Sequence, residues 1–238
     1  MLLLKENLAF ESIQTKFKGM RHSLSLRETA RDARNDHSFF MVMFVPKVMR
    51  KECSFNMRVI SGSARGRRLK EPAGFDIRPT SDKVKESIFN IIQFDIEGRK
   101  VLDLFAGTGQ LGIEALSRGA ARAVFVDTKA DAIKLIWSNL KHCKLEDSAQ
   151  VLSRDALRFL ESDEKYDLII IDPPYDSDLA EKSVEKIIEF DKLNANGIII
   201  CEINAERTTP DVPKPYFLHK EYKYGTIKIL RYEREITD

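Results

Sequence analysis

The sequence predicts an α/β fold in which helices cover both faces of a mixed seven-stranded sheet. From residue 100 onward, short apolar segments alternate with segments of helical period, and LIIID (168–172) is apolar at nearly every position. Strands that are apolar on both faces are typical of parallel sheets buried between helices. The last two strand-like segments have no helix between them, which predicts an antiparallel hairpin at the carboxyl end of the chain.

The elements follow in a regular order. A first helix is expected from Thr80 or Ser81, either of which can cap it, to about Gln93. The helices after it are expected to end near Arg118, Cys143, Glu161 and Phe190. The expected strands are 100–104, 123–127, 150–153, 168–172, 198–203, 216–222 and 226–232, and the last two flank a turn at 223–225.

Charge is distributed unevenly, although the whole chain has a formal net charge of only +2. Residues 1–56 are basic and lack a sustained helical or strand period, whereas the remainder after residue 70 is acidic. Between them lies a segment with no acidic residue and five basic ones, namely Arg58, Arg65, Arg67, Arg68 and Lys70. We therefore expect a poorly ordered leader over 1–56, a basic arm or hairpin over 57–77, and the main domain over 78–238.

The leader has two interpretations. It is either a native basic arm or upstream sequence translated from a misplaced start, with Met57 as the natural first residue. The organised pattern begins near Met57, which favours the second interpretation.

The cysteine and hydropathy patterns exclude several classes of protein. Cys53, Cys143 and Cys201 are isolated, which argues against a disulfide framework and favours a reducing cytoplasm. The longest apolar run near the N-terminus, 39–45, is far shorter than the roughly 18 residues of a membrane helix. It also lacks the order of a signal peptide. The histidines and cysteines show no metal-ligand spacing, so no metal site is expected.

Aspartates mark the carboxyl ends of four expected strands. Asp103, Asp127 and Asp172 lie at such ends, and Asp155 follows one closely. Each alone is most simply a helix cap or a solvated turn residue. In an open α/β sheet, however, ligands bind outside the carboxyl ends of the strands, so four aspartates there point to one shared crevice.

The segment VLDLFAGTGQLG (101–112) matches G-x-G-x-x-G through Gly107, Gly109 and Gly112. With Asp127 twenty residues after Gly107, the match alone indicates a dinucleotide site and an NAD-dependent oxidoreductase. The fingerprint normally has its first glycine directly at the strand end, however, whereas Leu104, Phe105 and Ala106 intervene here. The Asp103 carboxylate would also repel a pyrophosphate.

A cationic ligand would suit this segment better. S-adenosylmethionine carries a sulfonium and an ammonium but no phosphate, so Asp103 would complement its charge directly or through water. Asp127 would accept hydrogen bonds from the ribose hydroxyls, and Asp155 would lie near the adenine amine.

The segment Asp172-Pro173-Pro174-Tyr175 follows the LIIID strand directly. The lone pair of an exocyclic base amine is delocalised into the ring, so the amine is a poor nucleophile. The Asp172 carboxylate and the Pro173 carbonyl can both accept hydrogen bonds from that amine and direct its lone pair at a methyl group. The prolines fix φ and preorganise these acceptors, while Tyr175 can stack on an extruded base.

Together, these motifs resemble a class I S-adenosylmethionine-dependent methyltransferase with a Rossmann-like fold. More closely, the chain resembles the RsmD family of 16S rRNA guanine-N2 methyltransferases. The glycine segment and DPPY are specific to the superfamily, whereas ISGSARGRRL (60–69) and RPTSDKVKESIFNII (78–92) narrow the resemblance to this family. The resemblance covers about residues 57–235, and the leader has no counterpart in it.

The resemblance implies roles for single residues. Arg78 and Thr80 would hold the methionine end of the cofactor, and Gly107, Thr108 and Gly109 would line it. Asp127 and Asp155 would contact the ribose and adenine, and Asp172 with Tyr175 the target guanine. The basic segment 58–70 would contact rRNA phosphates. The implied substrate is 16S rRNA, within a 30S subunit or an assembly intermediate, and the implied enzyme is a cytoplasmic monomer.

Other functions remain open at this stage. The same DPPY chemistry serves adenine N6 in DNA or RNA and the glutamine of a protein substrate. From another class of protein, a non-catalytic rRNA-binding assembly factor would have the same basic segment but would not need an intact DPPY.

Overall fold

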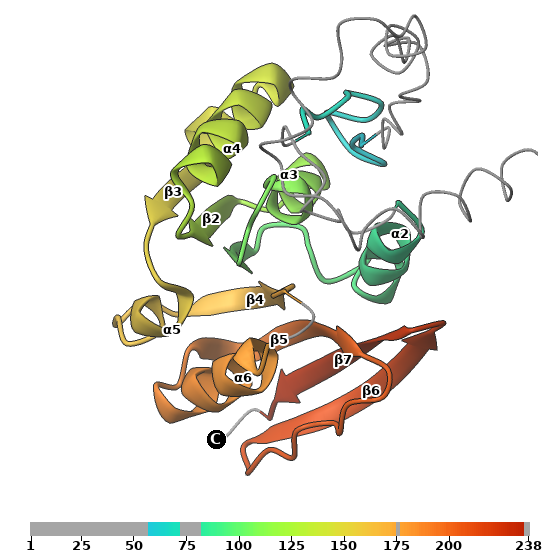
Figure 1. Ribbon diagram of the computed structural model, residues 1–238, viewed down its shortest axis with the longest axis vertical. Coiled ribbons are helices and arrows are strands. Elements are labelled where there is room, and N and C mark those ends of the chain that lie inside the picture. The colour runs from blue at the N-terminus through green and yellow to red at the C-terminus, as the bar shows by residue number, and fades with distance from the viewer. Residues whose placement is uncertain (1–56, 72–81, 175–176, 236–238) are drawn as a thin grey trace, which may run out of the picture. The chain divides into compact units, whose positions relative to one another are not determined.

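The computed structural model describes residues 57–71, 82–174 and 177–235 (Figure 1). Several predictions lie outside these residues and are not addressed by the structure. They concern the leader over 1–56, the roles of Arg78 and Thr80, and the role of Tyr175.

The structure confirms the predicted seven-stranded mixed sheet. Its strand order is β3-β2-β1-β4-β5-β7-β6, with parallel pairing from β3 through β5 and antiparallel pairing of β7 with both β5 and β6. The last strand of the chain therefore lies inside the sheet, and β6 forms the edge. The strands are β1 Lys100–Leu104, β2 Arg122–Asp127, β3 Ala149–Ser153, β4 Tyr166–Ile171, β5 Leu193–Asn204, β6 Tyr216–Tyr224 and β7 Ile227–Arg234.

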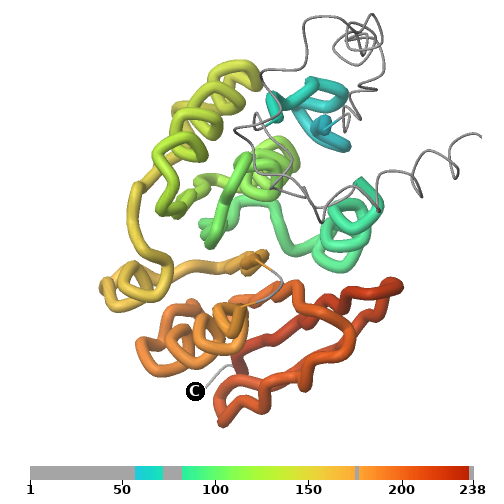
Figure 2. Tube along the Cα trace, in the orientation of Figure 1, coloured from blue at the N-terminus to red at the C-terminus, as the bar shows by residue number. Residues whose placement is uncertain are grey.

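Helices pack on both faces of the sheet (Figures 1 and 2). One hydrophobic core joins one face to α2, α3 and α4, and a second joins the opposite face to α5 and α6. The helices are α2 Asp82–Ile91, α3 Gln110–Ser117, α4 Ala130–Cys143, α5 Ala156–Phe159 and α6 Leu179–Glu189, with a 3₁₀ turn, η4, at Glu146–Ser148. In the described part of the chain, no helix is long and apolar enough to cross a membrane.

Alternation along the strands decides which polar residue faces which core. In β5, Ile198 and Ile200 belong to the core on the α2–α4 side, whereas Ile199 and Cys201 belong to the core on the α5–α6 side. A strand places successive side chains on opposite faces, so Glu202 falls on the α2–α4 side.

The closing strands differ from the prediction at two boundaries. β5 begins at Leu193, not at residue 198, because Leu193 pairs with Tyr166 before a register shift in the ladder. β6 runs to Tyr224, so the hairpin turn is the pair 225–226 and not 223–225. Gly225 has a φ of 60°, a conformation that glycine adopts without strain and that a two-residue hairpin turn requires.

The basic segment forms a small antiparallel hairpin. Its two arms meet at a bridge between Arg58 and Arg68, and the Leu69 amide donates to the Met57 carbonyl at 2.8 Å. The apolar side chains of the hairpin are buried in the α2–α4 core, namely Met57, Val59, Ala64 and Leu69. Arg58, Arg68 and Lys70 alternate with these buried positions and are exposed.

Candidate functional site

The sheet reverses its winding between β1 and β4. From β1 the chain adds β2 and β3 on one side, and it then returns to add β4 and β5 on the other. Such a switch point opens a crevice at the carboxyl ends of the two central strands. The predicted aspartates lie along that edge in the order of the strands. Asp103 and Asp127 belong to β1 and β2, whereas Asp155 and Asp172 follow β3 and β4.

The turn after β1 is held by hydrogen bonds that its own glycine amides donate. The Gly107 amide donates to Asp127 Oδ2 at 2.9 Å, and the Gly109 amide donates to the Ala106 carbonyl at 2.7 Å. Phe105 has a φ of 65°, which is unusual for a residue with a side chain, and Gly109 has a φ of 76°. The internal bonds therefore fix a conformation that the backbone would not adopt by itself.

This hydrogen bonding argues against the dinucleotide interpretation. A pyrophosphate needs available amides at the start of the helix, yet Gly107 and Gly109 already donate within the protein. The Gly112 amide likewise donates to Asp103 Oδ2 at 2.8 Å. An added Cβ at Gly112 would lie 2.3 Å from the ring of Phe125, so this glycine allows α3 to pack closely on β2.

Asp103 is almost fully buried, with 1% of its surface exposed. Burial raises the pKa of its carboxyl well above the usual range; the hydrogen bond from Gly112 lowers it, and the nearby charges of Asp172 and Asp127 raise it. The carboxyl of Asp103 is thus exposed to the charges of two acids at the ends of neighbouring strands. A cationic ligand in this crevice would stabilise the charged form of Asp103, whereas a phosphate would destabilise it further.

Asp127 and Asp155 both accept backbone hydrogen bonds. Asp127 is half-buried, and its Oδ1 accepts from the Lys129 amide at 2.8 Å while Oδ2 holds Gly107. A carboxylate can accept about four hydrogen bonds, so capacity for a ligand hydroxyl remains. Asp155 is exposed and caps α5 by accepting from the Arg158 amide at 3.0 Å. The cap fixes Asp155 at the carboxyl edge of β3.

The side chain of Asn139 ties the glycine turn to the basic hairpin. Thr108, which follows Gly107, is buried, and its carbonyl accepts from Asn139 Nδ2 at 3.0 Å. Asn139 Oδ1 accepts from the Lys70 amide at 2.8 Å. The expected cofactor loop and the expected RNA-contacting segment therefore share one fully buried side chain.

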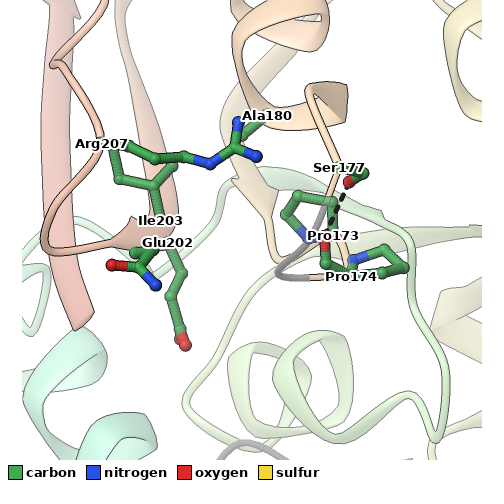
Figure 3. Close-up of a pocket in the computed structure, with 8 residues that line it drawn as sticks. Pro173, Pro174, Ser177, Ala180, Glu202, Ile203 and Arg207 are labelled. Atoms are coloured by element: carbon green, nitrogen blue, oxygen red, sulfur yellow. Dashed lines mark hydrogen bonds between the residues drawn. The ribbon is translucent and has the colours of Figure 1, made fainter. Parts of the chain in front are cut away.

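The segment after β4 is positioned differently. Pro173 is buried and Pro174 is exposed. The Pro174 carbonyl accepts from the Ser177 amide at 3.2 Å and from the Ser177 hydroxyl at 2.6 Å (Figure 3). This turn fixes the backbone just after Asp172 and leads into α6. A pocket lies beside it, lined by Pro173, Pro174, Ser177, Ala180, Glu202, Ile203, Asn204 and Arg207.

The basic residues of the hairpin fall into two groups. Arg58 lies 3.7 Å from Asp82, and the Arg67 guanidinium donates to the His142 carbonyl, so both contact the protein itself. The other three, Arg65, Arg68 and Lys70, are exposed and form no ion pair with the described residues. These three are the best placed to meet an external anion.

Sequence reasoning missed the buried polar groups that hold the hairpin. Glu114, in the middle of apolar α3, is fully buried and accepts from the amides of Ile60 at 2.7 Å and Ser61 at 2.9 Å. The Ser117 hydroxyl donates to the Ser61 carbonyl at 2.6 Å. Lys85, also fully buried, donates to the Arg58 carbonyl at 2.6 Å. The one local signal in the sequence that could have indicated these contacts was Glu114, an acid inside an otherwise apolar helix.

The chain is similar to several known proteins. The family model described as Conserved hypothetical protein 95 matches residues 57–233. The Bacillus subtilis protein YlbH is 42% identical over 75% of this chain and 99% of its own length. Ribosomal RNA small subunit methyltransferase D of Escherichia coli is 33% identical over 76% of this chain and 92% of its own length. The solved structure of yhhF from Escherichia coli is 32% identical and covers 75% of this chain and 98% of its own, with a TM-score of 0.69.

Proposed function

Because this chain belongs to the Conserved hypothetical protein 95 family, the RsmD family of rRNA methyltransferases, we propose that it methylates a guanine of 16S rRNA. The methyl group passes from S-adenosyl-L-methionine to the N2 exocyclic amine of the base. The observation that carries the proposal is the Asp172-Pro173-Pro174 segment, which lies at the sheet's switch point between a carboxylate-lined glycine turn and a pocket.

The residues of the crevice fit this cofactor. S-adenosylmethionine supplies a methyl group that its positive sulfonium makes electrophilic. The crevice offers it carboxylates, with Asp103 on β1 and Asp127 at the end of β2. The glycine turn approaches it with backbone alone, and the amides of its three glycines already donate within the protein. Asp127 supports the ribose and Asp155 the adenine.

The chemistry needs acceptors that orient an amine. The Asp172 carboxylate and the Pro173 carbonyl accept hydrogen bonds from the NH₂ group, so the lone pair points toward the methyl carbon. The carbon–nitrogen bond forms as the carbon–sulfur bond breaks, and the sulfonium becomes a neutral thioether. The nitrogen then loses a proton, for which Asp172 is the acceptor. Most of the acceleration comes from positioning, because both proline rings fix the acceptors beforehand.

The substrate assignment has two supports. The relative in Escherichia coli is named for the small-subunit rRNA, and this chain matches 92% of its length. The hairpin presents Arg65, Arg68 and Lys70 to solvent, as phosphate binding requires. The substrate is 16S rRNA within a 30S subunit or an assembly intermediate, and the enzyme acts in the cytoplasm as a monomer.

A methylation assay tests the proposal. The purified protein would be incubated with methyl-labelled S-adenosylmethionine and, separately, with small subunits, free 16S rRNA, DNA and a protein acceptor. Mass mapping is expected to find N2-methylguanine at one rRNA position, and the same position is expected to be unmethylated in a strain lacking the gene. Label in adenine N6 or in a protein glutamine would overturn the guanine assignment. Tight binding of NAD with no binding of S-adenosylhomocysteine in calorimetry would overturn the whole proposal.

A further inference from the structure

Glu202 is a buried acid that the proposed chemistry does not use. It interrupts the apolar strand IIICEI of β5, and only 3% of its surface is exposed. Burying a carboxylate costs free energy unless other groups compensate for it. Glu202 is a candidate for a role in the site because it interrupts an apolar strand directly beside the proline segment.

The register of the sheet places Glu202 beside Asp172. Ile171 of β4 pairs with Cys201 of β5, so the next residue on each strand lies side by side, with the strands roughly 4.8 Å apart. Glu202 shares the sheet face of Ile200, which is the α2–α4 face. Asp103 is two residues after Val101, which packs in the core on that same face. The charge of Asp172 raises the pKa of the Asp103 carboxyl, so the two acids lie near each other. Adjacent strands thus bring two carboxylates to the crevice.

The pocket beside the Asp172-Pro173-Pro174 segment also receives Glu202. Both prolines and Glu202 line it (Figure 3). Arg207 lines the same pocket, but it is paired with Glu181 at 2.9 Å, and the Glu202 side chain extends away from it. The wall of the pocket is thus formed by the proline segment after one strand and by Glu202 on the next.

The two carboxylates match one edge of guanine. On its Watson–Crick edge, guanine carries the N1–H donor directly beside the N2 amine. Adenine carries an acceptor at N1 beside its N6 amine, so a carboxylate facing N1 would attract guanine and repel adenine. An extruded base is read through this edge.

We propose that Glu202 is a specificity residue that accepts the N1–H hydrogen bond of the target guanine while Asp172 holds the N2 amine. This inference rests on the proposed function and deepens it, because it explains why the substrate amine belongs to guanine and not to adenine. A site that hydrogen-bonds a base is also left with an unsatisfied group when an analogue lacks the partner.

2-Aminopurine tests the inference, because it keeps the N2 amine and has an acceptor at N1. Small-subunit RNA would be prepared with guanine or 2-aminopurine at the mapped position, and kcat/KM measured for both. The wild-type protein is expected to prefer guanine by roughly 10- to 100-fold. In Glu202→Gln, the amide can either accept from N1–H of guanine or donate to N1 of 2-aminopurine, so the preference is expected to fall to a few-fold or less. A merely structural role would lower both rates together.

Glu181→Gln is the matched control, because it makes the same chemical change at an acid that pairs with Arg207 of the pocket but does not itself line the pocket. It is expected to leave the guanine preference unchanged. If Glu202→Gln retains the full preference for guanine, or if wild type methylates both bases equally, the role of Glu202 is wrong while the proposed function stands. If wild-type protein does not methylate guanine-containing rRNA at all, the proposed function itself fails.

Discussion

The two sides of the central crevice are held rigid by different means. After β1, the turn at 105–109 is fixed by hydrogen bonds, with the Gly107 and Gly109 amides bonded to acceptors inside the protein. After β4, the backbone is fixed by two proline rings and by Ser177, which donates twice to the Pro174 carbonyl. The first side contains glycines at left-handed backbone positions, and under the proposed function the prolines of the second side fix the Pro173 carbonyl that faces the substrate.

The difference separates binding from chemistry. A turn whose amides are committed presents a fixed surface of backbone and carboxylates, which suits a bound cofactor. A proline segment has no N–H at two successive positions, so it presents acceptors without competing donors. If this division is correct, variants on the β1 side should weaken cofactor binding, and variants on the β4 side should slow methyl transfer.

The largest effect is expected for Asp172→Ala. Loss of the carboxylate removes an oriented acceptor, so kcat should fall by about 100- to 1000-fold or more. Calorimetry with S-adenosylhomocysteine should show unchanged binding. Asp178→Ala, an exposed aspartate at the start of α6, is the control and should keep the wild-type rate. Normal turnover of Asp172→Ala would show that the β4 side has no chemical role.

Asp127→Ala should have the complementary effect. It removes the proposed ribose acceptor and frees the Gly107 amide, so affinity for S-adenosylhomocysteine should fall by about 10- to 100-fold. At saturating cofactor, kcat should stay within a few-fold of wild type. Asp131→Ala, an exposed residue of α4 with a 96% exposed side chain, should change neither value. If Asp127→Ala binds S-adenosylhomocysteine normally but loses most of its kcat, the β1 side is not confined to cofactor binding.

The fit of the hairpin on α3 is tested by two glycines with nearly equal φ. Gly62 has a φ of 83°, and an added Cβ would lie 1.7 Å from the Ser117 carbonyl oxygen. Gly66 has a φ of 80°, and an added Cβ would meet nothing within 4 Å. Both alanine variants are strained, but only Gly62→Ala must also displace the hairpin. Denaturant unfolding should find it less stable than Gly66→Ala by about 1–3 kcal/mol. Equal losses would mean that α3 does not hold the hairpin closely.

Arg65→Ala should have a smaller effect, and on RNA alone. Its side chain is exposed, so stability should not change, but affinity for small-subunit RNA should fall a few-fold. The slope of log affinity against log salt should decrease by about one. Arg122→Ala, which removes an exposed arginine at the start of β2 that bonds Gln150 on the neighbouring strand, is the control. If the slope of log affinity against log salt is the same for Arg65→Ala as for wild type, Arg65 does not contact an RNA phosphate.

Removal of residues 1–56 should have the smallest effect. The family model begins at Met57, so the remaining chain should unfold at the same temperature and methylate at the same rate. A truncated protein that unfolds or loses activity would show that the leader contributes to function.

Much of the fold was predictable because its signals are local. Apolar segments such as 168–172 set the strands, and the four aspartates follow the strands or end them, so their convergence needed only the rule for parallel sheets. The roles of Arg78, Thr80 and Tyr175 stay predictions, because these residues lie outside the described chain. The roles of the remaining site residues stay predictions as well, although the structure brings Asp103, Asp127 and Asp172 to one edge.

Contacts between distant segments were not predictable. Nothing near Asn139 in the sequence indicates that it joins Thr108 to Lys70, and nothing near Glu114 indicates that it holds the hairpin backbone. Asn139 looks like an ordinary polar residue of an amphipathic helix, and Glu114, although unusual in an apolar helix, gives no sign of which segment it bonds. Only packing brings their partners, which lie 31 to 69 residues away, within hydrogen-bond reach.

The sequence by itself determined the layers of the fold, the glycine turn and the proline segment, because each depends on periodicity or on the backbone preferences of a few neighbouring residues. Only the tertiary structure decided that β5 lies next to β4 in a register that sets Glu202 beside Asp172. Strand order and register depend on pairing between segments distant in the chain, and one residue of slip would turn Glu202 to the other face.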